Sequence, residues 1–364
     1  MPAPGSHRQV SHSFSRFVDS IIIRSSEVVP HRVLVVDDPH SRDHHPPDWH
    51  PESIARLAAV HRGVARVEGV ATVASRAASN EELELVHEPA LIARVRELSE
   101  AGGGSIDSDT FASAGTYDAA CFAAGAGLVA IDRLLADPTF GSAFVVTRPP
   151  GHHATRGQAM GFCFFNNIAI AATYLLKMGA RVAIIDWDVH HGNGTQDIFW
   201  DEDRVLYVSI HQEAHYPGTG HPHERGPAPE NITTVNLPLP AGATGDHYLA
   251  LFDDIAAPLV SDFAPDWILV SCGFDGHVND PLADMALEAV DFALFADRVA
   301  CWSPPGRSVF FLEGGYDLVA LEESSAAVLS VLTGAPIEEA RPTTGGPGAG
   351  RVSALRQFWD PDRE

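Results

Sequence analysis

Residues 181–195 read RVAIIDWDVHHGNGT, and the first part of this stretch decides the fold. After Arg181, four apolar residues follow one another without the alternation of apolar and polar side chains that marks a strand with one solvated face. Continuous apolar runs of this kind are typical of parallel strands that helices cover on both faces. We therefore predict a buried parallel strand over residues 181–185, with a polar cluster directly after it.

Short runs rich in valine, isoleucine and leucine recur along the chain and alternate with longer helical patterns. The other predicted strands cover residues 32–36, 143–147, 205–209, 233–237, 267–271 and 308–312. The predicted helices include residues 117–136, 167–178, 246–263, 287–302 and 318–332. This alternation predicts a doubly wound α/β domain.

No internal repeat and no break in composition divides the chain of 364 residues, so we predict one catalytic domain over residues 29–334. A polar, loosely ordered segment is expected over residues 1–28. Residues 335–364 are expected to form a Pro- and Gly-rich connection and a C-terminal tail that packs on the domain.

The composition excludes several classes of protein. A formal net charge of −24 argues against a protein that binds nucleic acid through its phosphates. The negative charge favours a cationic substrate, or it contributes only to solubility. The four cysteines, Cys121, Cys163, Cys272 and Cys301, form no C-x-x-C pair and indicate reduced, mostly buried thiols of a cytoplasmic protein. We expect no signal peptide and no membrane span, and the oligomeric state stays open, a homo-oligomer included.

Polar clusters follow four of the predicted strands directly. They read RPPGHH (148–153), DWDVHHGN (186–193), CGFDGH (272–277) and EGGY (313–316). The carboxyl ends of parallel strands lie along one edge of a sheet, where open α/β sheets place their ligand sites. We therefore expect these four distant clusters to meet in one crevice.

The second cluster has the character of a metal site. Asp186, Asp188 and His190 are alternate residues of an extended segment and project to the same side. They leave a buried strand, where unpaired carboxylates are costly unless a cation compensates them, and Asp275 can add a further ligand. Such a set leaves positions for water and substrate; Zn²⁺ is the first expectation, and Fe²⁺ or Mn²⁺ also suit the oxygen ligands. The alternative is an Asp/His hydrogen-bond network without metal.

Two further features point to catalysis. His152 and His153 are adjacent after a stiff Pro-Pro-Gly turn and are expected to transfer protons, with Asp186 and Asn193 as candidates to orient them. Tyr316 follows two glycines, which let the backbone bring its phenol close to a ligand, although a packing role explains the local sequence equally well. A glycine-rich cofactor loop and a G-x-S-x-G elbow are both absent, so a metal-activated water is the expected nucleophile.

With these motifs the chain resembles the histone deacetylase and acetylpolyamine amidohydrolase superfamily from about His50 to Leu332. The matching motifs are RPPGHHA (148–154), GFCFFNN (161–167), DWDVHHGNGT (186–195), YPGTG (216–220), GFD (273–275), DPL (280–282) and LEGGY (312–316). The resemblance implies the arginase-deacetylase fold, a single-domain three-layer αβα architecture with a mainly parallel, roughly eight-stranded sheet. Within the superfamily the chain is most similar to class II-like bacterial deacetylases.

The same resemblance implies roles for individual residues. Asp188, His190 and Asp275 look like the zinc ligands, and His153 looks like the general base that later acts as acid. Tyr316 looks like the tyrosine that hydrogen-bonds the substrate carbonyl. The residues that resemble the walls and rim of an acyl-lysine tunnel are Gly161, Phe162, Tyr216, Leu282 and Asp109. The residues that match a structural site for K⁺ or Na⁺ are Asp186, Asp188, His190, Ser209 and Ile210.

Three positions depart from the commoner pattern of the superfamily. Asn193 stands where some members have Asp, and a neutral partner should raise the pKa of its histidine less than a carboxylate would. Tyr216 replaces the more usual Phe and makes that wall slightly polar. Leu282 stands where a polyamine-selective branch has a Glu gatekeeper, which argues against tuning for free polyamines.

These residues predict hydrolysis of an N-acyl amide, with an acylated lysine peptide or a related acylated primary amine as substrate. An acetylpolyamine amidohydrolase is the main alternative among enzymes. Arginase-type ureohydrolysis needs a two-manganese cluster with more ligands, and His152, His153 and Tyr316 favour a deacetylase over it. The alternative outside enzymes is a non-catalytic protein that binds acyl-lysine.

Overall fold

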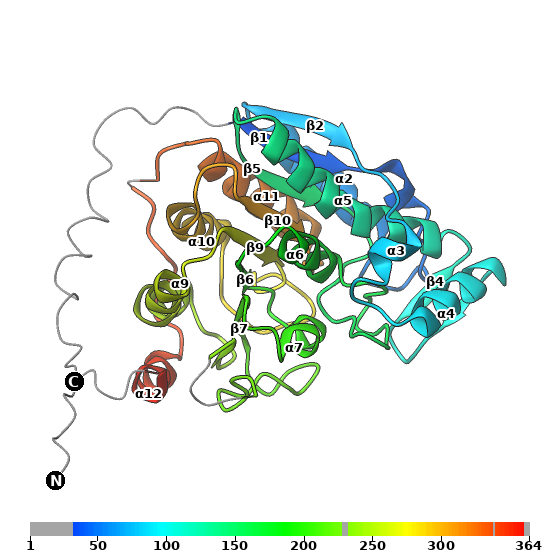
Figure 1. The fold of residues 1–364 in the computed structure, drawn as a ribbon. Coiled ribbons are helices and arrows are strands. Elements are labelled where there is room, and N and C mark those ends of the chain that lie inside the picture. Colours follow the sequence, from blue (N-terminus) through cyan, green and yellow to red (C-terminus); the bar gives the residue numbers. More distant parts are fainter. Residues whose placement is uncertain (1–31, 228–231, 338, 360–364) are drawn as a thin grey trace, which may run out of the picture. The chain divides into compact units, whose positions relative to one another are not determined.

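A sheet of eight parallel strands forms the centre of the fold in this computed structural model (Figure 1), which describes residues 32–227, 232–337 and 339–359. The strands are β1 (Arg32–Asp37), β2 (Val70–Ala74), β5 (Phe140–Val146), β6 (Val182–Asp186), β7 (Val205–Gln212), β8 (Thr234–Leu239), β9 (Trp267–Cys272) and β10 (Ser308–Leu312). Their order across the sheet is β2-β1-β5-β10-β9-β6-β7-β8, and every neighbouring pair is parallel. The predicted α/β class with a mainly parallel sheet of about eight strands is confirmed.

The continuous apolar runs fill both faces of the sheet. In β10, Val309 and Phe311 pack into one hydrophobic core, whereas Phe310 and Leu312 pack into the other. Successive side chains of a strand point to opposite faces, so a strand buried on both sides must be apolar at every position. All five residues of β6 are buried, and the first four are apolar as this requires; the fifth, Asp186, ends the strand.

Helices cover the two faces and give the three-layer αβα architecture (Figure 1). One face packs against α2 (Ile54–Ala65), α8 (Gly245–Leu251), the π-helical turn η3 (Phe252–Ala256), α9 (Ala257–Phe263), α10 (Ala289–Trp302), α11 (Leu318–Leu332) and α12 (Ala349–Trp359). The other face packs against α3 (Asn80–Leu83), α4 (Pro89–Glu100), α5 (Thr116–Ala136), α6 (Asn167–Lys177) and α7 (Asn193–Phe199). Helix α5 is long and apolar enough to cross a membrane, but 67% of its most apolar window is buried inside the domain, as in a core helix.

Several elements differ from the sequence expectation. The edge strand β2 and the short antiparallel pair β3 (Gly103–Ser105) and β4 (Phe111–Ser113) are additional, and their partly exposed or glycine-rich sequences carry little strand signal. The helix expected over residues 246–263 is interrupted by η3. Three of the four cysteines are buried and Cys301 is exposed, and within the described residues none of the four forms a disulfide.

The two ends of the chain differ in what can be described. The segment predicted to be loosely ordered, residues 1–28, lies outside the described residues. In the C-terminal segment, Val352 and Leu355 of α12 are buried in the core beneath α8, and Arg351 Nε donates to the Pro238 carbonyl over 3.0 Å.

Candidate active site

Four neighbouring strands end at the same edge of the sheet, and a polar cluster follows each of them. β5, β10, β9 and β6 lie side by side in this order. The loops after them carry His152 with His153, Tyr316, Asp275, and Asp188 with His190. A single cavity is lined by both histidines of the first loop, Asp188, His190 and Tyr316, among others. The order of the strands therefore brings the clusters together, as predicted.

Asp188, His190 and Asp275 lie together beside this cavity. One donor atom from each lies within 4.8 Å of the other two, and all three residues are buried. Nδ1 of His190 lies 3.2 Å from Oδ1 of Asp188 and 3.1 Å from Oδ2 of Asp275. Three potential ligands from two strands thus face a common point.

In each of these carboxylates, the oxygen that does not face Nδ1 of His190 is held by a backbone N–H group. Backbone N–H groups already donate to them: Gly314 to Asp188 Oδ2 over 2.8 Å, and Val189 to Asp275 Oδ1 over 2.9 Å. A Cβ on Gly314 would stand 1.9 Å from Asp275 Oδ2, so only glycine lets the chain pass this closely. Burial disfavours the charged form of His190, but the two carboxylates raise its pKa to about 10. The raised pKa means that the two carboxylates favour a proton on His190. A divalent metal ion bound here would supply the positive charge in place of that proton, so the site fits such an ion.

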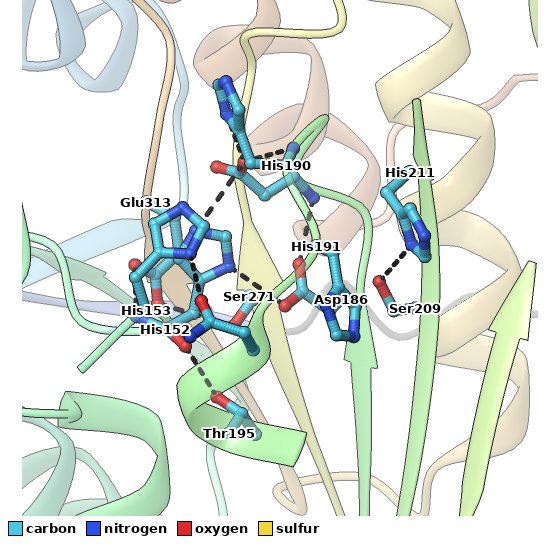
Figure 2. Close-up of polar contacts among 12 residues, drawn as sticks. His152, His153, Asp186, His190, His191, Thr195, Ser209, His211, Ser271 and Glu313 are labelled. Carbon is cyan, nitrogen blue, oxygen red and sulfur yellow. Dashed lines mark hydrogen bonds and ion pairs between the residues drawn. The ribbon is translucent and has the colours of Figure 1, made fainter. Parts of the chain in front are cut away.

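His152 and His153 share a loop but have different partners (Figure 2). Nδ1 of His152 lies 3.1 Å from Oδ2 of Asp186, and its Nε2 lies 3.7 Å from Oδ1 of Asp188. Nδ1 of His153 lies 2.8 Å from the amide oxygen of Asn193. The sequence offered Asp186 and Asn193 as partners of the two histidines without assigning them, and the structure places Asp186 against His152 and Asn193 against His153.

The two histidines differ in charge. Burial lowers the pKa of His152, but the carboxylates of Asp188, Asp186 and Glu313 outweigh it and raise that pKa to about 10. Burial and the positive charge of His152 hold the pKa of His153 well below its usual range. His153 is therefore neutral at pH 7, as a proton acceptor must be.

The loop that carries the histidines is held at both ends by buried polar side chains. Oε2 of Glu313 accepts from the N–H groups of Gly151 (2.8 Å) and His152 (3.2 Å). Asn166 caps α6 by accepting from Ala169 N–H over 3.0 Å, and its amide nitrogen donates to the Ala154 carbonyl over 3.1 Å. The start of α6 and the end of β10 thus fix the position of the loop.

Tyr316 reaches the same cavity from the loop after β10. Its backbone N–H donates to Oδ2 of Asp280 over 2.7 Å, and the guanidinium carbon of Arg56 lies 5.0 Å from the centre of its ring. Arg56 also donates through Nε to the Gly315 carbonyl over 2.6 Å. Burial and the nearby carboxylate of Asp275 keep the pKa of Tyr316 well above its ordinary value, so its hydroxyl stays protonated and can donate.

The sequence model of the histone deacetylase domain matches residues 50–332, which include every residue of this site. The chain belongs to the histone deacetylase family. It is 39% identical over 295 residues to a probable deacetylase of Archaeoglobus fulgidus, covering 78% of this chain and 82% of that protein. It is also 39% identical over 263 residues to a histone deacetylase-like amidohydrolase of Pseudomonas aeruginosa, covering 71% and 69%. The crystal structure of the HDA15 HD domain superposes with a TM-score of 0.83 at 31% identity, over 92% of this chain and 96% of that domain.

In this member of the histone deacetylase family, all five residues expected at the tunnel line the cavity. They are Asp109, Gly161, Phe162, Tyr216 and Leu282. The ring of Phe162 lies 5.8 Å from that of Tyr316, and the ring of Tyr216 lies 5.1 Å from that of His153, both nearly perpendicular. Burial and the neighbouring Asp107 raise the pKa of Asp109. The lining of the cavity thus includes the aromatic rings of Phe162, Tyr216 and Tyr316, and Asp109 is an acidic residue in it besides Asp188.

Of the five residues expected to hold K⁺ or Na⁺, Asp186 ends β6, Asp188 and His190 lie in the loop after it, and Ser209 and Ile210 lie on the adjacent strand β7. Asp186 at the end of β6 pairs in register with Ser209 on β7, and Ile210 follows. All five are buried, four of them fully and His190 with a small exposed part. Within the described residues, Ser209 Oγ makes its hydrogen bond to Nδ1 of His211 over 2.8 Å (Figure 2), and the Asp186 carboxylate is shared by His152 and Tyr207. The side chains of Ser209 and Asp186 therefore already have partners, and the cation site stays a prediction.

Several residues of the site were not singled out by the sequence. Pro150, Cys163 and His215 also line the cavity, and the His215 ring stacks on His190 at 5.0 Å. Glu313 and Asp280 lie inside motifs that carry the resemblance, so that signal could have marked them. Arg56 comes from α2, more than 200 residues before Tyr316 along the chain, and only the packing of α2 reveals it.

Proposed function

We propose that this chain is a zinc-dependent deacylase that hydrolyses the amide between an acetyl or similar acyl group and a primary amine, with the lysine side chain of a peptide as the preferred amine. The observation that carries the proposal is the cavity in which His153 and Tyr316 accompany the Asp188/His190/Asp275 set. The printed names of the relatives, a probable deacetylase and a histone deacetylase-like amidohydrolase, support it.

The metal would be held by Asp188, His190 and Asp275. A divalent ion bound there would act as a Lewis acid toward the acyl carbonyl and would lower the pKa of water at the site. Zn²⁺ suits a mixed carboxylate and imidazole set, and Fe²⁺ or Mn²⁺ remain alternatives for the assay. We further propose that K⁺ or Na⁺ binds at the ends of β6 and β7, where it would have a structural role and no part in the reaction.

His153 is the proposed proton carrier. Its Nδ1 faces the Asn193 oxygen, which leaves Nε2 as the basic nitrogen. Nε2 takes a proton from the attacking water as the new C–O bond forms. It then returns that proton to the amine nitrogen as the C–N bond breaks, which releases the free amine and the carboxylic acid, and the acid then loses its own proton at neutral pH. General acid–base catalysis of this kind contributes about 10²- to 10⁴-fold in rate.

His152 and Tyr316 stabilise charge around that transfer. His152 is protonated between Asp186 and Asp188, so it offers positive charge beside the reacting group. The Tyr316 hydroxyl donates to the carbonyl oxygen, where negative charge grows. Removing one such donor from an acyl-transfer site costs roughly 10²- to 10³-fold in rate.

The residues at the cavity favour a straight, apolar acyl-lysine arm. Phe162 and Tyr216 provide flat walls for methylene groups, and Leu282 adds an apolar side chain. Asp109 can accept hydrogen bonds from backbone N–H groups of a peptide. A free polyamine would bring further positive charges to a place where Leu282 offers no carboxylate, so the acylated lysine peptide is the better match.

A substrate panel tests the proposal. Purified full-length protein loaded with Zn²⁺ is assayed on acetyl-lysine peptides, longer acyl-lysine peptides, acetylputrescine and acetylspermidine, with the H190A variant as a blank. We expect acyl-lysine peptides to give the highest kcat/KM. Faster turnover of acetylspermidine would make the chain an acetylpolyamine amidohydrolase, and binding of acyl-lysine with no turnover under Zn²⁺, Fe²⁺ or Mn²⁺ would make it a non-catalytic binding protein.

A further inference from the structure

Residues 160–163 form a tight hairpin against the loop that carries His152 and His153. Met160 and Cys163 exchange two backbone hydrogen bonds of 3.0 Å, and the two residues between them have positive φ angles, 56° at Gly161 and 67° at Phe162. A Cβ on Gly161 would stand 2.5 Å from Cδ2 of His153, so the hairpin backbone lies directly on that ring. The hairpin therefore fixes the backbone from which the Met160 side chain extends, relative to His153.

The Asn193 amide lies between this hairpin and His153. Its oxygen lies 2.8 Å from Nδ1 of His153, and its nitrogen donates to the sulfur of Met160 over 3.4 Å. An amide has two ends of similar shape, one that accepts and one that donates, so its neighbours decide which way it points. A thioether sulfur can accept a hydrogen bond but has none to donate, so it favours the amide nitrogen over the amide oxygen.

The direction of this amide decides the tautomer of His153. With the Asn193 oxygen at Nδ1, the neutral imidazole carries its proton on Nδ1 and keeps Nε2 free as a base. With the amide reversed, its N–H group would donate to Nδ1 and the proton would sit on Nε2. That tautomer has no lone pair for the attacking water.

We propose that Met160 is a positioning residue of the active site, whose sulfur fixes the direction of the Asn193 amide and thereby the Nδ1–H tautomer of His153. The inference deepens the proposed function and rests on His153 being its base. Met160 does not line the cavity, so it acts through Asn193 and not through contact with substrate.

The carboxylate that some family members carry at position 193 would not need such a residue. Both of its oxygens accept, so either orientation keeps the proton on Nδ1. The need for a sulfur acceptor therefore follows from the amide. This difference supplies the test, because a Met160 substitution should matter with Asn at position 193 and not in an N193D background.

The variant to make is Met160→Leu, which keeps the volume of the side chain and removes the acceptor. Met160 is half-buried, and volume-conserving swaps of this kind are well tolerated. Met178→Leu, at an exposed position after α6, is the matched control. Two readouts are needed: kcat and KM on an acetyl-lysine peptide, and the ¹H–¹⁵N correlations of the ¹⁵N-labelled histidine rings, with His153 assigned by its loss in H153A.

We expect wild type to show His153 as the Nδ1–H tautomer and M160L to show a mixture of both forms. A partly competent population lowers kcat in proportion, by about 2- to 10-fold, while KM stays unchanged. M178L should match wild type in both readouts. In the N193D background, adding M160L should change neither kcat nor the tautomer.

The proposal is overturned if M160L keeps the wild-type tautomer, or if it lowers kcat by the same factor in the N193D background. A general packing role would give that second result, because it does not depend on the amide. A wild-type protein that hydrolyses no acyl amide, but whose His153 tautomer M160L still shifts, would refute the proposed function and support the role of Met160.

Discussion

The hydroxyl of Tyr207 lies 3.0 Å from Oδ2 of Asp186, the same carboxylate oxygen that faces Nδ1 of His152. Tyr207 is on β7 and Asp186 ends β6, and both are fully buried. Because the two strands are neighbours in the sheet, the pairing of β6 with β7 places this phenol next to the loop that carries His152 and His153. The carboxylate that orients His152 is therefore itself held by a donor from the next strand.

Tyr207→Phe should destabilise the fold, because the fully buried Asp186 carboxylate loses a hydrogen-bond donor. We expect the free energy of unfolding to fall by about 1–3 kcal/mol. Chemical denaturation measures the change. Tyr174→Phe is the matched control, since its hydroxyl donates to Asp132 over 2.9 Å in an exposed bond and its loss should cost less than about 0.5 kcal/mol. Equal losses in the two variants would contradict the assigned bond.

Tyr316→Phe should lower kcat on an acetyl-lysine peptide by about 10²- to 10³-fold, because the carbonyl oxygen loses its donor. Metal content should stay at the wild-type level, since Tyr316 is not among the ligand set. Tyr117→Phe serves as control and should keep full activity. It removes a hydroxyl that is hydrogen-bonded to Asn80 of α3 and Arg96 of α4. Near-wild-type turnover by Y316F would show that another group stabilises the oxyanion.

His190→Ala and Asp275→Ala should each abolish both metal binding and hydrolysis. Each substitution removes one of three side chains that face a common point. Metal content measured by mass spectrometry after gel filtration, together with activity, checks the result. Asp201→Ala, at an exposed turn, should change neither quantity. Full metal occupancy in both ligand variants would place the ion elsewhere.

His87 should make stability depend on pH between about 4 and 6.5. Burial lowers its pKa to about 4 in the folded state, where Nδ1 donates to the Thr155 carbonyl (2.9 Å) and Nε2 accepts from the Asn166 N–H (2.8 Å). In the unfolded chain, the His87 ring takes up a proton near pH 6.5. The stability that neutral, buried His87 contributes is therefore complete above that pH and is lost as the pH falls toward 4. The expected loss between pH 7 and pH 5 is about 2 kcal/mol.

Urea titrations of wild type and His87→Gln at the two pH values isolate this term from the other buried groups. The glutamine cannot be protonated in this range and can still accept from the Asn166 N–H. The pH dependence of H87Q should therefore be smaller than that of wild type by about the same 2 kcal/mol. Parallel curves for the two proteins would rule out the assignment.

The regular strands and the long helices could be predicted from the sequence because their signals are local. The run before Asp186 is apolar at every position, and the predicted helix over residues 318–332 has the same bounds as α11. The edge strand β2 and the short helices α3 and α7 were missed, since four to seven residues with mixed exposure carry no period that stands out. The π-helical turn η3 depends on how α8 and α9 pack, and no sequence pattern predicts it.

The chemical groups of the site could be named in advance because each follows a strand or sits in a motif. Asp188, His190, Asp275, the two histidines and Tyr316 were all identified in this way; the structure places Asp275 beside Asp188 and His190, and the other five line one cavity. Arg56 and Met160 could not be identified, since neither residue type suggests a function by itself. Their place beside Tyr316 and Asn193 depends on contacts between segments that are distant in the chain.

The sequence by itself predicted which residues would carry the chemistry and which edge of the sheet they would occupy, because strand direction and side-chain alternation are local properties of the chain. Only the tertiary structure decided which partner each of those residues has: the protonated His152 between two carboxylates, the neutral His153 against an amide, and the sulfur behind that amide. Such contacts depend on distances of about 3 Å between segments far apart in sequence, and burial then sets the charge of each group.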